Sequence, residues 1–223
     1  LRTVDITAKT WYYRLNCENV GALAGYIIGC NIINCTAMGA IKVSGAEAVG
    51  GLIGHYVHPT SPWPPSTSYV INNCWASVEI SNLYNYEYAS HGNPDLVNYS
   101  SASFVGGLIG ECNSTTTNDF EWGWEYYTTV SDCHAYGDIV WVKDERDTNR
   151  DSVIQNVGGF VGSASGGKFA RCCAKGEIDA IGAGAGFAGN VYYDAVFENC
   201  YARGNVTLPS WFIYGSYGYS WYG

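Results

Sequence analysis

The stretch Val49-Gly50-Gly51-Leu52-Ile53-Gly54 decides the fold of this chain because it returns along the sequence. Residues 105–110 repeat it letter for letter, and residues 157–162 repeat it as V-G-G-F-V-G. Weaker copies stand at residues 20–25 and 184–189. Five copies of one short unit predict a repeat protein in which each repeat is too small to bury a core alone. We expect the glycines of this hexapeptide to serve bends and positive φ angles.

A second unit, Asn-Cys-x-Ala-x-Gly-x-Ile, follows each hexapeptide. Its five copies start at residues 34, 73, 132, 171 and 199. Counted from the cysteine, alternate positions hold Cys, Ala, Gly (Val once) and Ile or Val, which predicts a β-strand with one buried face. Because three of these inward residues are small, we expect opposing walls to approach closely there. Successive copies are as little as 28 residues apart, enough for one coil of parallel strands and turns.

Stacking the copies predicts ladders of equivalent residues. The large apolar ladders are Leu23, Leu52, Leu108, Phe160 and Phe187, and Ile41, Ile80, Ile139, Ile178 and Val206. The cysteine ladder is Cys35, Cys74, Cys133, Cys172 and Cys200. Neighbouring rungs about 4.8 Å apart permit a disulfide by distance, but their parallel Cβ vectors make its geometry marginal, so disulfides and small apolar fillers both remain open. With nine cysteines, at least one thiol is free or bridges to another chain.

The paired units resemble the GLUG repeat, over roughly residues 19–207. That family occurs in extracellular and cell-surface proteins, including adhesin-like proteins and the non-catalytic part of immunoglobulin-A-cleaving peptidases. The resemblance implies an all-β parallel β-solenoid (β-helix) of about five repeats with inserted loops, and no catalytic residues. We expect an N-terminal capping strand within residues 1–18, where Val4, Ile6 and Ala8 alternate with polar residues. Residues 208–223 form an aromatic tail, a cap or an inter-subunit contact.

The charge and the amino-acid composition exclude some classes of binding partner. The net charge of −9, with only 14% charged residues, argues against nucleic acid and anionic membranes. The sequence contains no run of about 18 apolar residues, so we expect no membrane span. Cysteine content and four glycosylation sequons favour an extracellular or cell-surface location, and the start at Leu1 suggests a mature chain or a fragment. The sequon asparagines are Asn34, Asn98, Asn113 and Asn205.

Candidate binding residues are the aromatic side chains of the loops and of the outward position after each ladder cysteine. The carbohydrate- or partner-binding candidates are Trp63, Trp75, Tyr84, Tyr86, Trp122, Trp124 and Tyr201. The assembly candidates of the tail are Trp211, Phe212, Tyr214 and Trp221. We expect no catalytic, cofactor or metal site: Gly184-x-Gly186-x-x-Gly189 is a copy of the repeat rather than a dinucleotide fingerprint, and no C-x-x-C pair suggests zinc.

These patterns favour a non-enzymatic extracellular structural protein, the subunit of a surface filament or a rod segment of an adhesin. Its partners would be further copies of itself or other surface proteins and glycans. One alternative is a carbohydrate-binding module that uses the loop Trp and Tyr residues. Another is a β-helix polysaccharide lyase or hydrolase, for which Glu79, Asp138 and Glu177 offer a row of outward carboxylates. A solubilising stripe is the simpler interpretation of that row.

Overall fold

The computed structural model describes residues 4–8, 17–59, 68–82, 102–114, 128–141, 154–180, 182–193 and 195–207. Throughout these residues the regular structure is β, arranged in four sheets, and every strand pairing between them is parallel. The predicted all-β class with parallel strands is therefore confirmed.

Each repeat contributes to all four sheets in the same order. The first sheet joins β2 (Cys17–Gly21), β6 (Ala46–Gly50), β10 (Ala102–Gly106), β15 (Ile154–Gly158) and β20 (Gly182–Ala185). The second joins β3 (Ala24–Ile28), β7 (Ile53–Val57), β11 (Ile109–Ser114), β16 (Val161–Gly166) and β21 (Ala188–Tyr192). The third joins β4 (Ile32–Ile33), β8 (Val70–Asn72), β12 (Thr129–Ser131), β17 (Lys168–Ala170) and β22 (Val196–Glu198).

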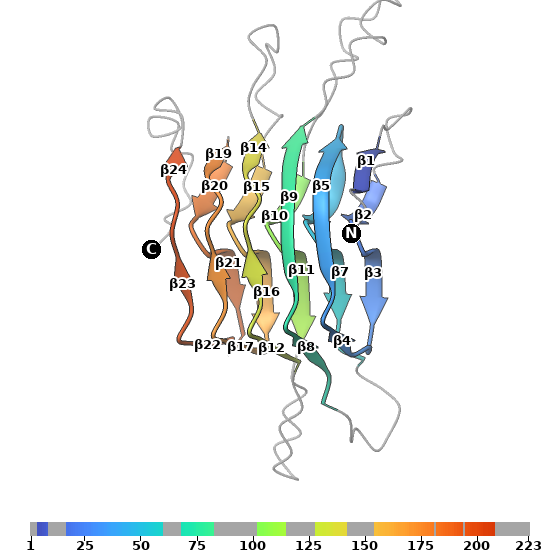
Figure 1. The fold of residues 1–223 in the computed structure, drawn as a ribbon, viewed down its shortest axis with the longest axis vertical. Helices are drawn as coiled ribbons and strands as arrows, with labels where there is room; N and C mark the ends of the chain where they lie inside the picture. Colours follow the sequence, from blue (N-terminus) through green and yellow to red (C-terminus); the bar gives the residue numbers. More distant parts are fainter. Residues whose placement is uncertain are drawn as a thin grey trace, which may run out of the picture.

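The fourth sheet holds the cysteine units, one per repeat. Its strands are β5 (Thr36–Val43), β9 (Trp75–Asn82), β13 (His134–Ala135), β14 (Ile139–Trp141), β18 (Cys173–Ala174), β19 (Ile178–Ala180), β23 (Tyr201–Ala202) and β24 (Val206–Thr207). We call one pass through the four sheets a layer: β2–β5 form layer 1 and β20–β24 form layer 5. The layers follow one another from blue to red in Figure 1.

Strand β1 (Val4–Ala8) adds to the layer-1 end of the fourth sheet. It pairs with β5, with Ile6 opposite Ile41. The alternation of residues 4–8 thus does correspond to a strand, and Ile6 packs partly buried against the core. Several strands also extend beyond the two repeat units: β7 reaches Val57, β9 reaches Asn82 and β11 reaches Ser114.

The hexapeptide forms the bend between the first and second sheets, as predicted. Its glycines are required by close packing rather than by positive φ, so the expectation of positive φ at these positions is wrong. A Cβ on Gly50 would collide with the carbonyl of Ile53, and one on Gly54 would lie 2.7 Å from the nitrogen of Val20 in the preceding layer. Backbone therefore occupies the space that any side chain would need.

Opposing walls meet across the layer at the same bend. A Cβ on Gly51 would lie 3.1 Å from Cβ of Ala76, and Gly107 faces Ala135 at the same distance. The predicted close approach at the small inward residues is confirmed. A larger residue at either member of such a pair would push the fourth sheet away from the bend.

Positive φ occurs instead at the residue before each ladder cysteine. These residues are Asn34, Asn73, Asp132, Arg171 and Asn199, with φ between 50° and 57°. Asparagine and aspartate tolerate this left-handed conformation better than most residues, which explains their place in the repeat. The row is cross-linked: Asn73 Nδ2 donates to Asn34 Oδ1 at 2.7 Å, and Arg171 donates to both oxygens of Asp132 at 2.7 and 2.6 Å.

The predicted apolar ladders form the core in the middle layers. Leu52, Leu108 and Phe160 are fully buried, but Leu23 in layer 1 is 48% exposed. Phe187 in layer 5 is only partly buried, although its ring stacks on Phe160 at 4.8 Å between centroids. The same residue type is thus core or surface according to whether a layer covers it on both sides.

Candidate functional site

The ladder cysteines occupy equivalent places in successive layers, and their thiols are free. Cys74, Cys133 and Cys172 are buried, and the eight cysteines whose side chains the structure describes are free. The Sγ of Cys133 lies 3.1 Å from the carbonyl of Ser131 and 3.6 Å from that of Ile71 in the preceding layer. Hydrogen bonds with Cys172 and Cys74, together with burial, raise the pKa of the Cys133 thiol. In the middle layers the ladder cysteines act as small buried fillers, Cys35 and Cys200 in the end layers are half-buried, and no disulfide joins the five.

On the outer surface of the fourth sheet, the residues after the ladder cysteines stand in register. Trp75 pairs with His134, His134 with Cys173, and Cys173 with Tyr201. Tyr136 lies two residues beyond His134 and contacts both neighbours, with ring centroids 6.3 Å from Trp75 and 5.8 Å from His134. We call the surface around Trp75, His134, Tyr136 and Tyr201 the aromatic face.

The aromatic face carries a cation and a covered thiol. Lys175 Nζ lies 5.3 Å from the centroid of the Tyr136 ring, a cation–π distance. Cys173 is on the outward side of its strand yet only 1% exposed, and its Sγ is 3.0 Å from His134 Nδ1. A hydrogen bond with Cys173 raises the pKa of the Tyr201 phenol. Such a surface can stack on the apolar faces of sugar rings or pack against another protein.

The three outward carboxylates occupy equivalent positions in successive layers and are exposed. Asp138 Oδ1 accepts a hydrogen bond from the backbone nitrogen of Glu177 at 2.8 Å, and Asn205 Nδ2 donates to Glu177 Oε1 at 3.4 Å. Asp138 and Glu177 thus hydrogen-bond to the next layer, which suits a stabilising stripe. No group of three or more His, Cys, Asp or Glu side chains suited to a metal occurs within the described part of the chain.

The structure separates the sequence candidates into three groups. Of the aromatic candidates it brings Trp75 and Tyr201 to one face, and three sequon residues, Asn34, Asn113 and Asn205, lie in described segments. Asn34 and Asn205 are exposed, whereas Asn113 is half-buried in β11. The remaining candidates lie outside the described residues: Asn98, Trp63, Tyr84, Tyr86, Trp122, Trp124, Trp211, Phe212, Tyr214 and Trp221.

Sequence reasoning did not single out Tyr136, Lys175 or a second polar cluster on the outer side of the second sheet. There His55 Nε2 lies 3.5 Å from Glu111 Oε2, and the Tyr26 ring meets the His55 ring edge-on at 5.2 Å. Burial lowers the pKa of His55 and raises that of Glu111. An alignment of the repeats could have indicated this cluster, because Tyr26, His55 and Glu111 occupy the same position of successive repeats. Each of these residue types occurs only once at that position, so no pattern marks it.

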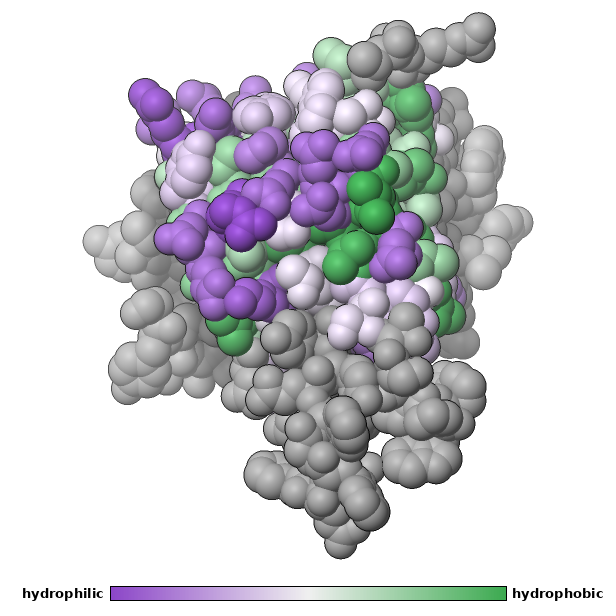
Figure 2. All heavy atoms as spheres, turned by 60° about the horizontal axis from the view of Figure 1, so that its bottom comes forward, coloured by the Kyte–Doolittle hydropathy of each residue, from purple (hydrophilic) through white to green (hydrophobic). Residues whose placement is uncertain are grey.

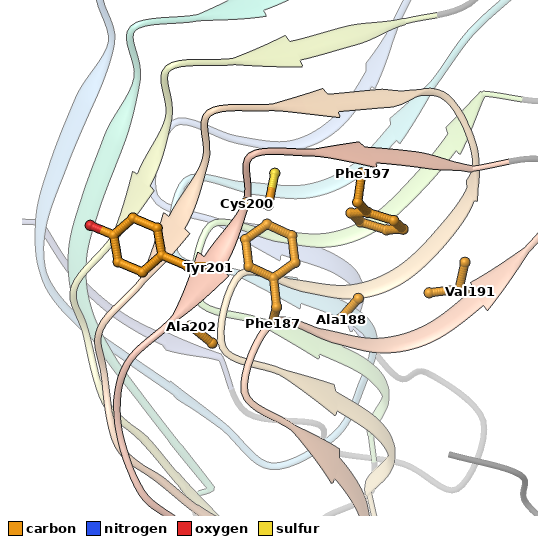
Figure 3. Close-up of a pocket in the computed structure, with 7 residues that line it drawn as sticks. All are labelled: Phe187, Ala188, Val191, Phe197, Cys200, Tyr201 and Ala202. Atoms are coloured by element: carbon orange, nitrogen blue, oxygen red, sulfur yellow. The ribbon is translucent and has the colours of Figure 1, made fainter.

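The layer-5 end of the stack contains an apolar pocket of about 320 Å³ (Figure 3). It is lined by Phe187, Ala188, Val191, Phe197, Cys200, Tyr201 and Ala202. The Tyr201 ring points away from the two phenylalanine rings (Figure 3). Viewed from the lower edge of Figure 1, the described surface is largely hydrophilic, with a smaller apolar patch (Figure 2). Exposed apolar groups concentrate in the end layers, as with Ile28 at 52% and Val191 at 48%.

Fold and repeat together define a class: parallel β proteins in which each repeat adds one layer of strands to the same four sheets. Within that class, a family model described as the GLUG motif matches residues 16–44, which span the first repeat. The chain therefore carries a GLUG motif in its first repeat, and the strand register places four further copies of the repeat in equivalent positions. Comparisons with curated proteins and with solved structures found no match. Among the described residues, no helix has the length and apolar character that crossing a bilayer requires.

Proposed function

We propose that this chain is a non-enzymatic extracellular structural protein whose five layers form a parallel β-solenoid, used as a rod segment of an adhesin or as the subunit of a surface filament. The observation that carries the proposal is the common register: each layer places its strands directly on those of the layer before. Such a stack is stiff along one axis, because every layer is held to its neighbours by rows of backbone hydrogen bonds.

The ends of the stack support self-association. Layer 1 exposes Leu23, Ile28 and Ile33 by about half, and layer 5 exposes Val191 and Tyr193 at 48% and 74%. Unlike the sides, these ends carry apolar ladder positions and edge strands, which invite pairing with another chain. Contacts between unlike ends propagate into a fibre when the rotation between copies does not close.

An extracellular location fits several separate observations. The resemblance to the GLUG family, whose motif matches residues 16–44, implies a surface protein. Charged residues make up only 14% of the chain, and the sequon residues Asn34 and Asn205 are exposed. The described thiols are free, so the cysteine content supports this location less than the sequence suggested.

Negative-stain microscopy and analytical ultracentrifugation of the purified chain test the proposal. We expect rods or fibres whose length grows with protein concentration. Ile28→Glu puts a charge on the layer-1 end and should shorten them, whereas Tyr136→Glu, on the side of the stack, should leave their length unchanged. Single globular particles at every concentration, from a chain with the circular dichroism of folded β structure, would overturn self-association.

A carbohydrate-binding module is the second candidate, favoured by the aromatic face. Half-buried Trp75 and exposed Tyr136 form a ring pair with Lys175 over the tyrosine ring, the kind of platform on which sugar rings stack. A glycan array should give hits that disappear in Trp75→Ala and Tyr136→Ala. Tyr193→Ala, at the layer-5 end, is the matched control. Hits that survive both face variants would exclude this surface.

A further inference from the structure

Layer 5 leaves positions open that are buried in the layers before it. Strands β20 and β21 are the last strands of the first and second sheets as far as the structure describes the chain. Positions that are buried in layer 4 are open here: Ala164 is fully buried, but its partner Val191 is 48% exposed. The pocket of about 320 Å³ between β21 and β22 lies where the ladder residues of a further layer would pack (Figure 3).

The 16 residues that follow layer 5 in the sequence can supply a cover for this end. Strand β24 ends at Thr207, at the edge of layer 5, and residues 208–223 follow. This segment lies outside the described residues, and its sequence contains no Asp, Glu, Lys, Arg or His. An uncharged, aromatic segment matches the apolar lining of the pocket.

The segment is long enough for two strands. Thr207 pairs with Asp179, and from Asp179 the chain needs 13 residues to complete β20 and β21 at Tyr192. The 16 residues from Thr207 to Gly223 exceed that length. One strand on β20 and one on β21 therefore fit, with the bend between them.

One spacing of the repeat, that between layers 1 and 2, fits the segment. Lys42 and Thr207 occupy equivalent places in the fourth sheet, and each is followed seven residues later by a large residue, Val49 and Tyr214. Residues 214–217 read Tyr-Gly-Ser-Tyr, which reproduces the large–Gly–small–large order of Val-Gly-Gly-Leu at the hexapeptide bend. By this alignment Tyr217 takes the ladder position that follows Phe187.

We propose that residues 208–223 dock on the layer-5 end of their own chain as a partial sixth layer. Residues up to Tyr214 add to β20, residues after Ser216 add to β21, and the ring of Tyr217 lies over Phe187 in the pocket. Strand addition satisfies the edge groups of β20 and β21, and the aromatic side chains remove the pocket from water. This docking goes beyond the structural role proposed above, because it holds for a single chain; in a filament, the docked segment would then be the layer-5 surface that meets the layer-1 end of the next copy.

Hydrogen exchange on the full-length chain, read by mass spectrometry, tests the docking. We expect amides of residues 208–223 to exchange at least about tenfold more slowly than in an unstructured peptide. Tyr217→Glu should abolish that protection and also speed exchange in β20 and β21. The control Tyr193→Glu alters a 74% exposed residue that does not line the pocket, and should change neither.

Three results would overturn the docking. Free exchange of residues 208–223 in the wild-type chain excludes it, whatever the variants do. Protection that disappears on dilution assigns the pocket to the segment of a second copy. Protection that survives Tyr217→Glu places the segment elsewhere. A chain that forms no rods but protects the segment would refute the filament and keep the docking, so the two proposals fail separately.

Discussion

Truncating the same ladder residue in two layers measures how much of the core depends on stacking. Leu108 in layer 3 is fully buried between Leu52 and Phe160, whereas Leu23 in layer 1 is 48% exposed. Leu108→Ala should cost about 3 to 5 kcal/mol, because it removes buried methyl groups and leaves a cavity that the flanking layers cannot close. Leu23→Ala should cost about 1 kcal/mol, roughly half the transfer free energy of a leucine side chain.

Urea unfolding followed by far-ultraviolet circular dichroism is the assay. With an m-value of about 2.5 kcal/mol/M, the midpoint should fall by about 1.5 M for Leu108→Ala and about 0.4 M for Leu23→Ala. Hydrogen exchange in β10 and β11 should confirm that the Leu108 change acts in the middle of the stack. Equal shifts would refute the reasoning, since they would mean that layer 1 is covered as fully as layer 3.

Three further predictions concern packing, thiols and pH. Gly107→Ala should cost about 2 kcal/mol or more in a urea titration, because its Cβ meets backbone of the next layer, while Gly186→Ala, which would contact only a side chain, should cost clearly less. Iodoacetamide at about pH 8 should label exposed Cys30 quickly and spare Cys112, whose pKa burial raises to about 12 and which is fully buried; equal labelling by mass spectrometry would contradict its burial. Burial lowers the pKa of His55, so the unfolded chain protonates first and stability is lost as the pH falls through and below about 6.5; His55→Gln should make the urea midpoint less sensitive between about pH 7.5 and 5.5, and an unchanged slope would remove His55 as the cause.

The repeat made much of the fold predictable from sequence. Strict alternation after each cysteine predicts which residues point inward, and the small size of Ala76 and Ala135 predicts how closely the walls approach. Stacking then follows, because a repeat that cannot bury its own apolar face needs identical neighbours. Periodicity therefore carried both the strand assignment and the ladder partners.

Features that depend on neighbours rather than on residue type were not predictable. Leu23 and Leu52 are the same residue in the same repeat position, and only the presence of a layer on each side distinguishes them. The left-handed conformation of Asn73 leaves no trace in hydrophobic alternation, so positive φ was expected at the hexapeptide glycines instead. The aromatic face was predictable only in part: the outward position of Trp75 recurs in every repeat, but at the position of Tyr136 no other repeat has an aromatic residue.

The common register also separates reach from chain length. Equivalent ladder cysteines in layers 1 and 2 are 39 residues apart, those in layers 2 and 3 are 59 apart, and Glu177 precedes its layer-5 counterpart Asn205 by 28. Each interval nevertheless advances the stack by one strand spacing, about 4.8 Å. The length of such a protein along the stack is therefore set by the number of repeats. Residues inserted within a repeat form loops at its side, and only duplication or loss of a whole repeat changes how far the protein extends.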